Sequence, residues 1–165
     1  MKLVFIACNK KGGAFMNYET SKFTLRLVRE ENYDYNGKIS SPESAYELIV
    51  QKLELDQMTE EVFCILGLDV KNQVIGVMEV SRGTLSASLV HPREVFKRAL
   101  LMNASKIFLA HNHPSGVVDP SREDKSLTKK MEEAGSLLGI EVLDHIIVGN
   151  CESSNFYSFK EDEKM

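Results

Sequence analysis

Apolar residues recur at helical spacing in three segments of the chain. The first begins near Ser41, a good N-cap that a proline follows, and the second covers residues 92–104, opened by Pro92. The third begins near Ser121 and has one apolar face. We therefore expect three amphipathic helices. Their inward positions include Ala45, Leu48, Ile49 and Leu53 in the first and Leu127, Met131, Ala134 and Leu138 in the third.

Apolar runs of strand length lie between these helices. Residues 61–69 and 73–81 are separated by the turn-like Val-Lys-Asn, which predicts a hairpin with Glu79 near the end of its second strand. This order of elements predicts an α/β fold, a mixed β-sheet with helices packed on its faces. The remaining strand-like stretches cover residues 83–92, 106–110, 140–149 and, in a more exposed form, 152–160.

The first 40 residues differ in character from the rest. They contain a turn at 10–13, an alternating strand pattern at 22–28 and a polar loop at 30–37. We therefore expect residues 1–40 to form an N-terminal extension, as a strand or hairpin, and residues 41–165 to form one domain.

The composition is that of an ordinary globular domain. Its 165 residues are 43% hydrophobic and 27% charged, so a core can form without disulfides or a structural metal. The formal net charge of −4, with scattered basic residues, gives no drive toward nucleic acid. The cysteines Cys8, Cys64 and Cys151 lie far apart without a C-x-x-C pair, which favours reduced thiols in the cytoplasm.

Targeting and membrane segments are not expected. The apolar run from Leu3 to Cys8 is shorter than the roughly 7–15 residues of a signal-peptide core. No apolar stretch approaches the roughly 20 residues that a membrane span requires. We therefore expect a soluble protein with no membrane partner.

Two histidines follow the predicted strand 106–110 directly. Side chains at positions i and i+2 of a strand point to the same side, so His111 and His113 can bind one metal ion. A His-x-His pair alone is a weak indication, because such pairs often occur by chance.

Asp124 strengthens the indication. It lies one turn before Leu127 on the inward stripe of its helix, where an unpaired carboxylate is costly and is normally neutralised or bound to a cation. The alternative is a helix start in which Ser121 is the N-cap and Asp124 favours the helix dipole. The alignment with the apolar stripe favours the ligand.

Two imidazoles and one carboxylate leave the fourth position of a tetrahedral zinc ion open for water, as in a catalytic site. We therefore expect one zinc ion per chain, held by His111, His113 and Asp124, although other divalent ions suit the same ligands. Glu79, at a strand end among apolar residues, is the candidate general base. Its alternative is an outward carboxylate of an alternating strand.

The motifs match a known family. The segments RGTLSASLVHPRE, IFLAHNHPSG, PSREDKSLT and VLDHIIVG, within residues 40–160, resemble the bacterial RadC family of the JAB/MPN/JAMM metalloprotease superfamily. The resemblance implies a cytidine-deaminase-like mixed sheet between helices, zinc at His111, His113 and Asp124, acid/base work by Glu79, and help to the oxyanion from Ser121. RadC proteins usually carry an N-terminal helix-hairpin-helix region, which residues 1–40 do not resemble.

The leading hypothesis is therefore a zinc metallopeptidase or isopeptidase that acts on a peptide or protein. A nucleic-acid substrate, suggested by the literal HNH string and the RadC name, is weaker because no basic stripe is present. A deaminase lacks its H-x-E and P-C-x-x-C signature here. A non-catalytic interaction module stays open, as does the choice for His145 between a satisfied core residue and a partner of a metal ligand.

Overall fold

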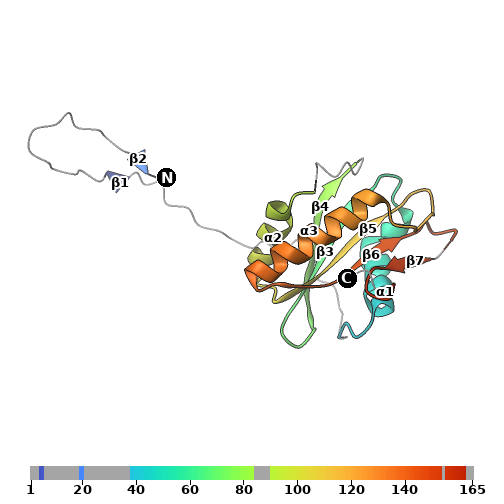
Figure 1. Ribbon diagram of the computed structural model, residues 1–165, viewed down its shortest axis with the longest axis horizontal. Helices are drawn as coiled ribbons and strands as arrows, with labels where there is room; N and C mark the ends of the chain where they lie inside the picture. The colour runs from blue at the N-terminus through green and yellow to red at the C-terminus, as the bar shows by residue number, and fades with distance from the viewer. Residues whose placement is uncertain (1–3, 6–18, 21–37, 84–89, 154, 163–165) are drawn as a thin grey trace, which may run out of the picture.

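A five-stranded mixed sheet organises the chain. The computed structural model describes residues 4–5, 19–20, 38–83, 90–153 and 155–162. The strand order is β4-β3-β5-β6-β7, in which β5 and β6 are parallel and the other neighbours are antiparallel (Figure 1). The strands are β3 (Val62–Leu68), β4 (Val74–Arg82), β5 (Lys106–Asn112), β6 (Glu141–Val148) and β7 (Phe156–Ser158). The predicted α/β class with a mixed sheet is confirmed.

Helices cover both faces of this sheet. On one face, α1 (Pro42–Leu53) packs with Cys64, Leu66 and other residues of β3, β5 and β6 in a buried apolar cluster. On the other face, α2 (Pro92–Leu101) and α3 (Arg122–Leu138) pack on Phe63 and Ile65, and Figure 1 shows α3 lying across the sheet. We call these the α1 face and the α3 face.

Each of the three α-helices begins at a residue whose side chain caps it, whereas the short 3-10 helix η1 (Leu55–Gln57) has no such cap. Ser41 forms a capping box with Ser44. The imidazole of His91 accepts a hydrogen bond from the backbone N–H of Arg93 at the start of α2. Ser121 caps α3, and this helix ends at Gly139, whose φ of 68° is the left-handed conformation that glycine adopts without strain. The three predicted helices are confirmed.

The predicted β3–β4 hairpin is also confirmed, and β4 contains a bulge that decides where its side chains point. Phe63 pairs with Ser81, but the next residue, Cys64, pairs with Glu79, so Val80 is the extra residue. Beyond the bulge, Glu79 and Cys64 are direct cross-strand partners whose side chains lie on the same face.

The N-terminal part of the chain is described only in pieces. Strands β1 (Val4–Phe5) and β2 (Glu19–Thr20) pair antiparallel in a separate two-stranded sheet, whereas the strand expected at 22–28 lies outside the described residues. Ile39 is buried in the cluster of the α1 face. The division of the chain at residue 41 stays a prediction.

The strand expected at 83–92 and the expected lack of a membrane span are tested only in the described residues. Most of the strand expected at 83–92 also lies outside the described residues. In the described part of the chain, no helix combines the length and apolar character needed to cross a bilayer. A cytoplasmic location stays a prediction.

Candidate metal centre

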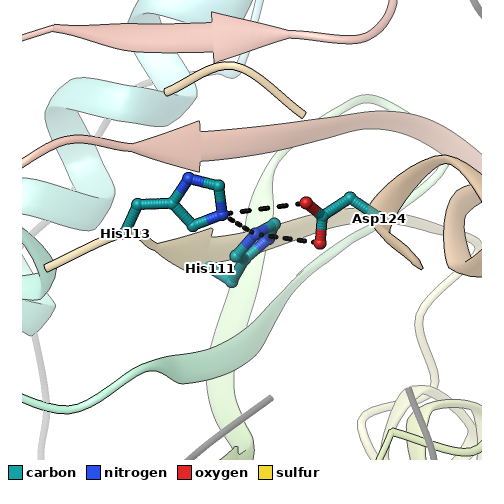
Figure 2. Close-up of side chains that lie close together, drawn as sticks. All are labelled: His111, His113 and Asp124. Carbon is teal, nitrogen blue, oxygen red and sulfur yellow. Dashed lines mark hydrogen bonds and ion pairs between the residues drawn. The ribbon is translucent and has the colours of Figure 1, made fainter. Parts of the chain in front are cut away.

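Three potential metal ligands meet where β5 ends against the N-terminus of α3 (Figure 2). The Nε2 atoms of His111 and His113 lie 3.0 Å apart. Asp124 Oδ1 is 3.3 Å from His111 Nε2, and Asp124 Oδ2 is 3.7 Å from His113 Nε2. Since the ligand atoms of the three residues all lie within 4.8 Å of one another, the set fits one shared cation.

The charges of these three residues suit a cation. Burial lowers the pKa of His111 to about 4, so this imidazole is neutral and keeps a lone pair at neutral pH. Burial alone would raise the pKa of Asp124, but the neighbouring imidazole of His113 and the hydrogen bonds from Ser121 hold it well below its usual range. A carboxylate thus stays ionised beside a neutral imidazole, which is the donor chemistry that divalent transition metals bind.

Asp124 fills both of the roles that its position in the sequence allows. Its Oδ2 accepts hydrogen bonds from the backbone N–H and the hydroxyl of Ser121, at 2.8 and 2.5 Å, while Ser121 Oγ accepts from the Asp124 N–H. Its Oδ1 faces His111. The capping box therefore orients the carboxylate toward the imidazoles, and Ser121 touches the site through Asp124.

His113 is oriented by the loop that follows it. Its Nδ1 lies 2.6 Å from the backbone carbonyl of Val117, where it can only donate, so a neutral His113 has its lone pair on Nε2. The loop turns back at Gly116, whose N–H bonds to the carbonyl of His113. Gly116 has a φ of +79°, and a Cβ there would lie 2.8 Å from the Asn150 side chain, so the turn requires glycine.

His145 on β6 lies directly behind His111. Its ring is fully buried, and its Nε2 lies 2.9 Å from His111 Nδ1. Of the two alternatives that the sequence left open, the structure therefore favours a residue that bonds a potential metal ligand over an isolated core histidine.

Asn112, between the two histidines, points to the opposite side of β5. Its side-chain oxygen accepts a hydrogen bond of 2.7 Å from the N–H of Val62. Its amide donates to the backbone carbonyls of Met58 and Glu60 at 3.2 and 3.0 Å. The asparagine of the HNH string thus fastens the segment 58–62 to the end of β5.

An open cavity of about 810 Å³ surrounds the three ligands. Four further acidic residues line it, namely Glu60, Glu61, Asp119 and Glu123, and no lysine or arginine stands among the described residues of its wall. The cavity is therefore strongly acidic around a potential cation site.

The structure does not bring Glu79 to this cavity, contrary to the sequence prediction of a general base. Glu79 is the cross-strand partner of Cys64, which packs on the α1 face, whereas His111 is the partner of Phe63 on the α3 face. Its side chain is 45% exposed, and its carboxylate forms an ion pair of 2.7 Å with Arg82. The bulge in β4 shifts the alternation of side chains along the strand, so the Glu79 side chain points away from the cavity. The sequence pattern did not reveal this bulge.

Sequence reasoning missed Glu61. It precedes β3 immediately, on the same side of the strand as Phe63, and it lines the cavity. The pKa of His113 is raised chiefly by the neighbouring carboxylate of Asp124, and the charge of Glu61 adds to this effect. The available signal was an acidic residue at the start of an apolar strand, but its use required knowing that β3 runs antiparallel beside β5.

Comparison with known proteins agrees with this geometry. A family model described as RadC-like JAB domain matches residues 39–165. The chain belongs to the RadC-like JAB domain family. The α/β sheet of the structure fits the JAB/MPN fold, and His111, His113 and Asp124 lie together in a possible metal site.

Three relatives of this RadC-like JAB domain are each named UPF0758 protein. One from Clostridioides difficile is 49% identical over 116 residues, which are 68% of this chain and 48% of the relative. One from Caldanaerobacter subterraneus is 44% identical over 130 residues, 76% of this chain and 55% of the relative. One from Symbiobacterium thermophilum is 46% identical over 154 residues, which are 93% of this chain and 60% of the relative. The chain spans about half the length of the curated relatives it matches.

The Asn112 contacts predict a stability effect in this RadC-like JAB domain. Asn112→Ala leaves a buried N–H and two carbonyls without their partner, so we expect the free energy of unfolding to fall by about 1–3 kcal/mol. Urea unfolding measures this change. Gln51→Ala, at an exposed position of α1, is the control and should stay within about 0.5 kcal/mol of wild type. An equal fall in the free energy of unfolding of both variants would show that the Asn112 hydrogen bonds add no specific stability.

Proposed function

We propose that this chain is a zinc-dependent hydrolase that cleaves an amide bond of a peptide or protein. The observation that carries the proposal is the convergence of two imidazoles and one carboxylate at an open cavity that also contains Glu61. Membership of the RadC-like JAB domain family, which is compatible with metallopeptidase chemistry, supports it.

The donor atoms suit zinc because they are two nitrogen atoms and one oxygen atom, which leaves a coordination position for substrate. A zinc ion bound by His111, His113 and Asp124 would polarise a scissile carbonyl and lower the pKa of a bound water. Glu61 is the proposed general base that takes the proton of the attacking water and delivers it to the leaving nitrogen.

Glu61 supports this role better than Glu79 does. It needs no rearrangement to face the cavity, whereas Glu79 lies on the other face of the sheet. The Asn112 side chain, on the strand that carries His111, hydrogen-bonds the backbones of Glu60 and Val62. These two residues flank Glu61. A proton acceptor and two ligands are thus fastened to one strand end, which limits their relative movement.

Ser121 is proposed to assist the oxyanion. It lines the cavity, but its hydroxyl proton is donated to Asp124 in this structure. Assistance to the oxyanion therefore requires the hydroxyl to turn toward the substrate, while the Ser121 N–H keeps its bond to Asp124.

The charge of the cavity supports a protein substrate over nucleic acid. Glu60, Glu61, Asp119 and Glu123 repel a phosphate backbone and attract lysine or arginine side chains. The HNH string, which suggested a nuclease, contains two potential metal ligands and one structural asparagine.

Metal binding gives the first test of the proposal. We expect one equivalent of zinc per chain, and we expect His113→Ala and Asp124→Asn to weaken binding by about 100-fold or more, because each removes one of three ligands. Elemental analysis and competition with a chelator measure this. The control is the triple Cys8, Cys64 and Cys151 to Ser variant, which should bind as wild type does. A loss of zinc in the control alone would overturn the ligand assignment.

Glutamine variants of Glu61 and Glu79 test which of the two carboxylates is the general base. Zinc-loaded Glu61→Gln should keep its metal and lose about 10²–10⁴-fold in kcat, because the amide cannot accept the proton. Glu79→Gln should stay within about twofold of wild type, because Glu79 faces away from the cavity. Cleavage of a library of internally quenched peptides by the full chain measures both. A large loss of kcat in Glu79→Gln alone would identify Glu79 as the general base. An unchanged kcat in both variants would reject the mechanism.

The acidic wall predicts substrate preference. Peptides with lysine beside the scissile bond should be cleaved about fivefold faster per charge than those with glutamate, and salt should weaken this preference. Glu123→Lys should reduce it. The matched control is Glu133→Lys, the same charge change about 15 Å further along α3. An equal effect of the two variants would show that overall charge, and not the cavity wall, sets the preference.

A further inference from the structure

A chain of hydrogen bonds runs from His111 through the core and back to α3. The buried ring of His145 stacks on Phe159 and meets the edge of Phe63, so it is held in one orientation. Its Nε2 contacts His111 Nδ1 at 2.9 Å. Its Nδ1 contacts the hydroxyl of Thr128 at 2.6 Å, and that hydroxyl lies 2.8 Å from the backbone carbonyl of Asp124.

The chemistry of these groups sets the direction of the chain. A carbonyl oxygen can only accept, and a threonine hydroxyl has one proton, so the short contact with Asp124 uses the proton of Thr128. Thr128 Oγ1 must then accept from His145 Nδ1–H. If the hydroxyl donated to His145 instead, two oxygen lone pairs would face each other at 2.8 Å. Only one direction satisfies both contacts.

The same reasoning extends to His111. A neutral His145 with its proton on Nδ1 has a lone pair on Nε2, which accepts from His111 Nδ1–H. His111 then has its own lone pair on Nε2, beside Asp124 and His113. We propose that Thr128 and His145 are positioning residues that hold His111 in the tautomer able to bind a metal ion.

The other imidazole gives independent support. The Val117 carbonyl sets a proton of His113 on Nδ1, so when both imidazoles are neutral the Nε2 lone pairs of His111 and His113 face each other at 3.0 Å. This arrangement is repulsive by itself and favourable around a shared cation. The chain of hydrogen bonds also ends on the backbone carbonyl of Asp124. The orientation of His111 is therefore set from α3, the helix that carries Asp124.

This inference rests on the metal site of the proposed function and is independent of hydrolysis. Thr128→Val keeps the shape of the side chain but removes the hydroxyl, so His145 Nδ1 loses its acceptor. We expect zinc affinity to fall by about 10–100-fold, the usual effect of losing a partner of a metal ligand. Thr128→Ser keeps the hydroxyl and should bind zinc within about threefold of wild type. Thermal unfolding checks that all three proteins are folded.

Tautomers supply the second measurement, which a merely structural role would not change. Two-bond ¹H–¹⁵N NMR correlations of the full chain before zinc is added should show His111 and His145 protonated on Nδ1 in wild type and Thr128→Ser. In Thr128→Val, the proton of His145 should shift toward Nε2. An unchanged zinc affinity in folded Thr128→Val, or a wild-type His145 protonated on Nε2, would overturn the inference.

The outcomes also separate this inference from the proposed hydrolase. A chain that binds zinc with the expected tautomers but cleaves no peptide would support the positioning role and count against hydrolysis. Cleavage by a chain whose Thr128→Val variant binds zinc normally would do the reverse. A wild-type chain that binds no divalent cation would overturn both.

Discussion

Successive side chains at the end of β5 point to opposite sides of the sheet, and the geometry of the candidate site depends on this alternation. His111 points to the α3 face, where it meets Asp124 and His145. Asn112 points the other way and fastens the segment that carries Glu61. A change of register by one residue would exchange the two side chains, so the buried pairing of β5 with β3 and β6 is what preserves the site.

The N-terminus of α3 supplies the charge. Asp124 is held by Ser121 through one carboxylate oxygen and offers the other to His111, so the bonds that start the helix also direct the ligand. Its side chain is only 11% exposed, and burying the negative charge of the carboxylate is costly even with the hydrogen bonds from Ser121. A shared cation would remove that cost, which links the stability of this helix start to metal binding.

The scaffold and the site use different residues. The two apolar clusters hold α1 on one face and α2 and α3 on the other, and the cavity lies at the edge of the second cluster. Polar contacts deep in the fold, such as the one between Asp144 and Ser158 at 2.6 Å, attach β7 without reaching the cavity. The acidic wall comes mainly from the loops before β3 and before α3, segments that can vary while the core is kept.

The sequence alone determined most of the elements and pointed to the three candidate ligands. Hydrophobic periodicity and capping residues identified the three helices and the main strands of the sheet, because these signals are local. The pair His111 and His113 and the inward position of Asp124 followed from the two periods of strand and helix, and the structure brings them together.

Only the tertiary structure decided what surrounds those ligands. A bulge in β4 sends Glu79 to the α1 face, and a bulge leaves no clear mark in an alternating sequence. Glu61 reaches the cavity because β3 runs antiparallel to β5, which depends on strand order. Thr128 of α3 contacts His145 of β6, and His145 in turn contacts His111 of β5. Such long-range contacts are set by packing, which local patterns do not encode.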